Sequence, residues 1–250
     1  MERIRRAIAR VALRGYRSPL APHRMSVMHD AVTALTRPVE GLQWQREVVG
    51  GVPVERTLSV GANATLIYLH GGAYGRASAY GYQGVVGRLA EAAWMAAVMP
   101  DYSLVSDAVA LEELVGMYTA LLSGGMDPQT TVIAGDSAGG GLALALAMTL
   151  RDRGIARPGA LGLIRPVPTS AAAPSCEDVA GLPPIVLQST AEDPLVVEIT
   201  SFATDVDHQR LDGLWHDIHL KAGAPGEADF AVTEFGARLR QHVQSRFETA

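Results

Sequence analysis

Thr131-Val132-Ile133-Ala134-Gly135-Asp136-Ser137-Ala138-Gly139 is the stretch that decides the fold. Its apolar start predicts a buried strand, and the Ala- and Leu-rich residues 142–150 predict a helix directly after it. The pattern Gly-x-Ser-x-Gly between them places Ser137 on a sharp strand-to-helix turn, where the flanking glycines remove Cβ atoms that would collide with neighbouring backbone. A glycine-rich helix start capped by serine is the alternative interpretation. The strand before and the helix after favour the sharp turn.

Strands and helices alternate on both sides of this turn. Gly50-Gly51 divides residues 43–58 into two alternating segments, which predicts a hairpin, and Pro53 favours an edge position for its second strand. Further strands are predicted at 65–70, 96–99, 160–164 and 184–188, and helices at 80–93, 109–122 and 229–247. The order implies right-handed crossovers. The predicted fold class is α/β, with a mostly parallel central sheet and helices on both faces.

Composition limits the domain count and the partners. The 250 residues, of which 48% are hydrophobic, suit one domain, with a helical or cap segment at 1–40 and the α/β domain at 41–250. A net charge of −5 gives no basic field for nucleic acid. The single cysteine, Cys176, cannot form an internal disulfide and has no feature of a catalytic thiol.

The N-terminal residues do not resemble a targeting or membrane segment. Arginines interrupt the apolar residues of 1–10, so the apolar core of a signal peptide is missing, and no run approaches the ~18 apolar residues of a membrane span. We expect a cytoplasmic protein whose N-terminal helix packs on the domain rather than anchoring it to a membrane. A homodimer is compatible with the sequence.

Serine is a poor nucleophile at neutral pH, so its use requires a base and donors aimed at the developing oxyanion. The helix that begins at Ser137 directs its free amides toward the site, and the amide of Ala138 is the first predicted donor. His70-Gly71-Gly72-Ala73 ends the preceding strand, and we expect the amides of Gly72 and Ala73 to supply the rest. For His70 we favour a structural role, bracing this loop by hydrogen bonding.

A base and its orienting acid should follow the serine in the order acid, then histidine. Asp193 follows a late strand and is chosen over Glu192, Asp205 and Asp207, although a turn carboxylate capping the next helix would look the same.

For the base we choose His216, with His219 as the alternative. His208 follows the acid too soon, and His242 lies in the last helix. The pair His216-x-x-His219 lacks the third ligand and the glutamate of a zinc helix, so no metal and no cofactor are predicted.

Several motifs together resemble the bacterial hormone-sensitive-lipase family of carboxylesterases. They stand in the family's order from about Val48 to the C-terminus: His70-Gly71-Gly72-Ala73-Tyr74, Asp101-Tyr102, Gly135-Asp136-Ser137-Ala138-Gly139-Gly140, Leu182-Pro183-Pro184, Asp193-Pro194-Leu195 and Trp215-His216. The resemblance implies an α/β-hydrolase fold and hydrolysis of short- to medium-chain acyl esters through an acyl-enzyme. It implies the roles of nucleophile for Ser137, base for His216 and orienting acid for Asp193.

The chain also departs from the family pattern. Ala73 replaces a third glycine, and the segments 103–107, 166–175 and 193–216 are shorter than in the family, the second of which implies a reduced cap. These departures keep open an impaired, ligand-binding relative, and the fold does not exclude a deacetylase or amidase on the same triad. All three triad candidates are present, which favours the esterase.

Overall fold

The structure, a computed structural model, describes residues 39–58, 63–72, 79–167, 181–189, 199–200, 205–212, 214, 218–223 and 225–244. The segment 1–38, Ala73, Cys176, Asp193 and His216 lie outside the described residues. The predicted division at residue 40 therefore stays a prediction.

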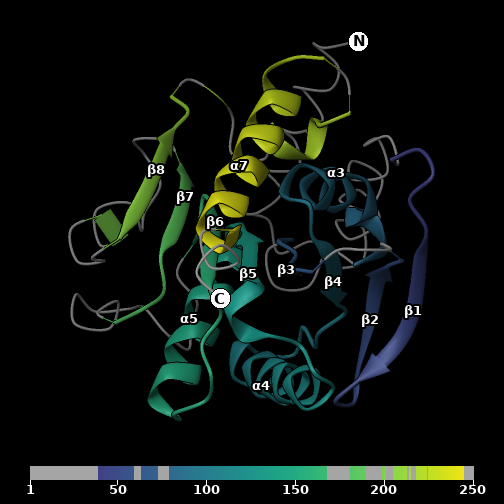
Figure 1. Cartoon of the computed structure of the whole chain (residues 1–250), viewed down its shortest axis with the longest axis vertical. Coiled ribbons are helices and arrows are strands. Elements are labelled where there is room, and N and C mark those ends of the chain that lie inside the picture. The colour runs from purple at the N-terminus through teal and green to yellow at the C-terminus, as the bar shows by residue number, and fades with distance from the viewer. Residues whose placement is uncertain are drawn as a thin grey trace, which may run out of the picture.

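The described residues form one sheet of eight strands in the order β1-β2-β4-β3-β5-β6-β7-β8. Pairing is antiparallel between β1 and β2 and between β2 and β4, and parallel throughout the rest of the sheet. The predicted mostly parallel sheet is confirmed (Figure 1). The strands are β1 Trp44–Val49, β2 Val52–Thr57, β3 Thr65–Leu69, β4 Ala96–Pro100, β5 Thr131–Asp136, β6 Ala160–Ile164, β7 Ile185–Ser189 and β8 Val206–Arg210.

The hairpin at Gly50-Gly51 is confirmed, but the edge assignment from Pro53 is wrong. The strand β1 is the edge, and β2 lies between β1 and β4. Proline is tolerated because it precedes the residues of β2 that pair with β4, which begin at Val54. The Pro53 carbonyl still accepts a hydrogen bond from the Asp101 amide.

Helices cover both faces of the sheet, as the alternation predicts. Figure 1 shows α3 (Gln83–Ala93) packed beside α7 (Glu227–Gln244), while α4 (Asp107–Ser123) packs beside α5 (Ser137–Asp152). In the described part of the chain, three short 3₁₀ helices precede α3, β5 and α7: η1 (Tyr80–Tyr82), η2 (Pro128–Thr130) and η3 (Ile218–Lys221). None of the helices that the structure describes is long and apolar enough to cross a membrane.

The core alternates along the central strands. In β3, Leu66 and Tyr68 face the cluster under α3 and α7, whereas Ile67 and Leu69 face the cluster under α4 and α5. All four are fully buried, as expected for a parallel strand covered on both faces. Because β3 and β5 are parallel neighbours, their carboxyl ends meet at one edge of the sheet, where β5 passes directly into α5. In open α/β sheets this is the edge where ligands bind.

Candidate active site

Ser137 occupies the turn between β5 and α5 in a left-handed backbone conformation, with φ +50°. A residue with a Cβ adopts this conformation only at a cost of about 1 kcal/mol or more. The turn also needs its glycines: a Cβ on Gly135 would lie 2.5 Å from the Gly139 carbonyl oxygen, and one on Gly139 would lie 2.6 Å from that of His70. The sharp turn that exposes Ser137 is therefore built by close backbone packing.

Asp136, the last residue of β5, is a buried carboxylate that joins several elements. Its Oδ1 accepts hydrogen bonds from the Tyr68 hydroxyl and the Gly71 amide, both at 2.9 Å, and its Oδ2 accepts one from the Tyr82 hydroxyl at 3.0 Å. His219 Nε2 lies 3.3 Å from the same Oδ2. Burial acts to raise the pKa of Asp136, but His219, the Gly71 amide and the Tyr68 hydroxyl outweigh it and lower the pKa to about 2. The carboxylate is ionised at neutral pH.

The amides at the start of α5 are not capped by the preceding side chain. Asp136 is the N-cap residue of α5, yet its carboxylate makes no capping hydrogen bond because it faces Tyr68, Gly71 and Tyr82 instead. Ala138, the predicted donor in this first turn, therefore has no competing acceptor from Asp136. An uncapped helix N-terminus favours a negative charge at this point.

The loop after β3 is fixed from two sides. The Gly71 amide is used by Asp136, and a side chain on Gly71 would overlap that carboxylate. His70 is buried; its Nδ1 lies 2.8 Å from the Gly71 carbonyl oxygen, and its ring stacks on Tyr102. These contacts support a bracing role for His70. Gly72 has φ +117°, a conformation that suits glycine, and it stays a predicted oxyanion donor together with Ala73.

The segment after β6 supports the nucleophile turn. The amide of Val167 donates to the carbonyl of Ser137 at 2.9 Å, and a Cβ on Gly140 would lie 3.1 Å from Pro166. Arg165 is buried, with φ +46°, and its Nη1 donates to the Leu214 carbonyl at 3.3 Å. This segment therefore connects the turn to the chain just before His216.

Three of the four histidines considered as the base are described. His208 Nε2 lies 2.7 Å from Ser189 Oγ on the neighbouring strand, and His242 Nε2 lies 4.0 Å from Asp207 Oδ2. His219 is 1% exposed and faces Asp136. Its burial against Asp136 favours an orienting role over that of the base. His216 stays the predicted base.

Two of the three carboxylates weighed against Asp193 are described. Asp207 pairs with Arg238 across to α7, and Asp205 is exposed just before β8. Glu192, like Asp193, lies outside the described residues, so Asp193 stays the predicted acid. Among the described residues, no group of three or more His, Cys, Asp or Glu side chains could hold a metal ion.

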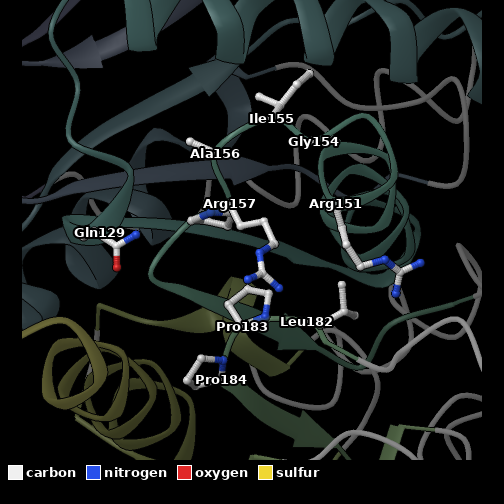
Figure 2. Close-up of a pocket in the computed structure, with 10 residues that line it drawn as sticks. Gln129, Arg151, Gly154, Ile155, Ala156, Arg157, Leu182, Pro183 and Pro184 are labelled. Carbon is white, nitrogen blue, oxygen red and sulfur yellow. The ribbon is translucent and has the colours of Figure 1, made fainter.

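A cavity of about 660 Å³ lies at the opposite edge of the sheet (Figure 2). Its lining residues precede β5, β6 and β7, whereas Ser137 follows β5. Figure 2 shows the Arg157 side chain extending toward Pro183, and its Nη1 donates to the Gly181 carbonyl. Arg151, also in the lining, pairs with Asp152. The cavity is separate from the candidate active site.

The sequence missed several side chains that shape this site. Tyr68, Tyr82 and Tyr102 read as apolar positions of a strand, a helix start and a loop, yet their hydroxyls hold Asp136 and the loop after β3. Arg165 directly after an apolar strand was the one visible signal, because a charged residue there is unusual in a buried position.

The chain is similar to known α/β-hydrolases in both sequence and fold. A family model described as alpha/beta hydrolase fold matches residues 66–176. The fold is shared with an esterase of the bacterial hormone-sensitive lipase family, with TM-score 0.81 and 24% identity over 95% of this chain and 97% of that one. A hormone-sensitive lipase from a metagenome library gives TM-score 0.79 and 20% identity over 96% and 98% of the two chains.

Relatives that are similar in sequence include two proteins named acetyl-hydrolases. LipR of Mycobacterium tuberculosis, which carries an acetyl-hydrolase name, is 41% identical over 294 aligned positions that span 96% of this chain and 96% of LipR. An acetyl-hydrolase of Streptomyces hygroscopicus is 38% identical over 105 residues, which are 41% of this chain and 35% of that protein. The chain is a carboxylic ester hydrolase of the same α/β-hydrolase family as LipR, and it shares its fold with the esterase of the bacterial hormone-sensitive lipase family.

Proposed function

We propose that the chain is a serine carboxylesterase that hydrolyses short- to medium-chain acyl esters, acetyl esters among them, through an acyl-enzyme on Ser137. The observation that carries the proposal is the left-handed Ser137 between β5 and α5, a costly conformation that presents a hydroxyl at the carboxyl edge of the sheet. The buried, ionised Asp136 beside it supports the proposal, because it fixes the turn and the loop after β3 in one arrangement.

In the acylation step, Ser137 Oγ attacks the ester carbonyl carbon while His216 accepts the hydroxyl proton. Asp193 orients His216 and stabilises the imidazolium that forms. The tetrahedral intermediate collapses by breaking the bond to the alcohol oxygen, and His216 returns the proton to that oxygen. The alcohol leaves, and the acyl group stays on Ser137.

The oxyanion of this intermediate accepts hydrogen bonds from the amides of Gly72, Ala73 and Ala138. In deacylation His216 deprotonates a water molecule whose oxygen attacks the acyl carbon. The bond to Ser137 Oγ then breaks, His216 returns the proton to Oγ, and the carboxylic acid is released. The uncapped N-terminus of α5 supports this assignment, because its amides are oriented before any charge develops.

The acetyl end of the substrate range is supported by the names of LipR and the Streptomyces relative. The alignment with LipR has 294 positions, 44 more than the 250 residues of this chain, so LipR carries segments that this chain lacks. Shorter segments around the site favour an open acyl pocket over a long enclosed one. We expect a weak dependence of KM on acyl length.

Hydrolysis of p-nitrophenyl acetate, butyrate and octanoate, beside p-nitroacetanilide as the matched amide, tests the proposal. We expect ester turnover by the wild type and a loss of about 10³-fold or more in both Ser137→Ala and His216→Ala. Turnover of the amide at a comparable rate would assign the amidase alternative. A folded wild type no faster than Ser137→Ala would assign the ligand-binding alternative.

A further inference from the structure

Leu214 and His219, which precede and follow the predicted base in the chain, each contact a buried side chain at the carboxyl edge of the sheet. Arg165 Nη1 donates to the Leu214 carbonyl at 3.3 Å. His219 Nε2 lies 3.3 Å from Asp136 Oδ2. Arg165 directly follows β6 and Asp136 ends β5, so both contacts come from the carboxyl edge of neighbouring strands.

Both side chains are buried polar groups at the carboxyl edge of the sheet. Arg165 and His219 are each 1% exposed, although taking a cation or a polar ring out of water is unfavourable without compensation. Arg165 also adopts φ +46°, a conformation that side-chain-bearing residues avoid. A buried guanidinium and a left-handed backbone in one residue at the active edge indicate a functional constraint.

The contact between His219 and Asp136 is polar and buried, with His219 Nε2 3.3 Å from Asp136 Oδ2. Asp136 has three other donors in Tyr68, Gly71 and Tyr82, so the carboxylate stays satisfied when His219 is replaced. An apolar replacement of His219 should therefore leave the nucleophile turn folded, which separates its role from that of Asp136.

We propose that Arg165 and His219 are positioning residues that clamp the chain on either side of the predicted base, His216, and so limit where that base can lie relative to Ser137. This inference rests on the proposed function. His216 follows Leu214 by two residues and precedes His219 by three, so the reach of the chain ties its position to these two contacts. A displacement of about 1 Å in a catalytic group costs up to about 100-fold in rate.

The test compares kcat and KM for p-nitrophenyl acetate in His219→Phe, Arg165→Met and His219→Gln. We expect His219→Phe and Arg165→Met to lower kcat about 10- to 100-fold with KM within about threefold, because positioning affects the transition state more than binding. His219→Gln should stay within about threefold of wild type, since its amide N–H can face Asp136 from a similar distance.

The matched control is His208→Phe. His208 also makes a short polar contact with a buried side chain, Ser189, but on β7 and β8 away from the turn. We expect its kcat to stay within about twofold of wild type. An equal loss of kcat in His208→Phe, in step with its thermal unfolding midpoint, would show a general effect on stability and overturn the inference.

Unchanged kcat in folded His219→Phe and Arg165→Met would overturn the clamp while leaving the esterase assignment intact. A wild type without turnover would instead overturn the proposed function and the clamp with it. If His219→Phe does not fold, His219→Asn replaces it, because its shorter side chain cannot reach Oδ2. Loss of kcat in His219→Asn but not in His219→Gln supports the clamp, and equal kcat values in the two variants contradict it.

Discussion

The hydroxyl of Tyr102 donates a hydrogen bond to the main-chain carbonyl of His70 over 2.6 Å, and the two rings stack with their centroids 4.7 Å apart. This contact ties the residues after β4 to the loop after β3. Because that loop carries the predicted oxyanion donors Gly72 and Ala73, its position should affect the rate of the chemical step.

Tyr102→Phe keeps the stacked ring and removes the hydrogen bond. We expect kcat/KM for p-nitrophenyl acetate to fall about 3- to 10-fold and the free energy of unfolding to fall by about 1 kcal/mol, the usual net contribution of one such bond. Ester kinetics and urea unfolding measure both. Tyr80→Phe is the control, because Tyr80 is 73% exposed. Equal effects of the two changes would contradict the bracing role.

Ser137→Gly and Ser137→Ala both remove the hydroxyl, but they should differ in stability. Glycine adopts φ +50° without a Cβ penalty, whereas alanine retains it. We expect the Gly variant to unfold with a free energy about 1 kcal/mol higher than the Ala variant, measured in urea. A Gly variant that is equal or less stable would argue against backbone strain at the nucleophile.

Gly139→Ala should abolish the fold of the turn. Its Cβ would overlap the carbonyl oxygens of Leu69, the last residue of β3, and of His70 directly after it, and these backbone atoms cannot move aside. We expect little folded protein, or a loss of several kcal/mol in the free energy of unfolding. Gly116→Ala in α4 is the control, because its nearest atom lies 3.9 Å away and alanine favours a helix. A stable, active Gly139→Ala would contradict the close approach of α5 to β3.

The pKa of Asp136, lowered to about 2 by His219 and its hydrogen-bond donors despite burial, makes stability depend on pH. A depressed folded-state pKa adds stability that is complete above the unfolded value, near 4, and is lost as pH falls toward 2. Between pH 5 and pH 3, wild type should therefore lose about 1 kcal/mol more than Asp136→Asn, in which this group no longer titrates. Urea unfolding at the two values measures this difference. Parallel losses would show that Asp136 does not stay ionised in the folded state.

Most of the fold could be predicted from local patterns. The apolar run before Gly135 and the Ala- and Leu-rich run after Gly139 specify β5 and α5, and both are confirmed. The error at Pro53 came from a rule about a single residue: whether a missing N–H matters depends on where the partner strand begins, and β2 and β4 pair only from Val54. The range of residues over which two strands pair is a tertiary property, so a short stretch of sequence does not reveal it.

Part of the candidate site could also be predicted from local sequence, and part of it could not. The pattern around Ser137 follows from steric limits on adjacent residues, so it is visible in the sequence. The four groups around Asp136 come from β3, the loop after it, η1 and η3, which are far apart in the chain. His219 read as an alternative base because spacing alone cannot distinguish a histidine that faces substrate from one that faces a buried carboxylate.

Reaction with a fluorophosphonate tests the central claim most directly, because only an activated serine forms the covalent adduct at an appreciable rate. Wild type and Ser137→Ala would each be incubated with the probe at neutral pH, and intact mass and peptide mapping would locate the adduct. We predict one adduct per wild-type chain, on the peptide that contains Ser137, and none on Ser137→Ala. A folded wild type that stays unlabelled, or a Ser137→Ala chain labelled as fast as wild type, would contradict Ser137 as the nucleophile.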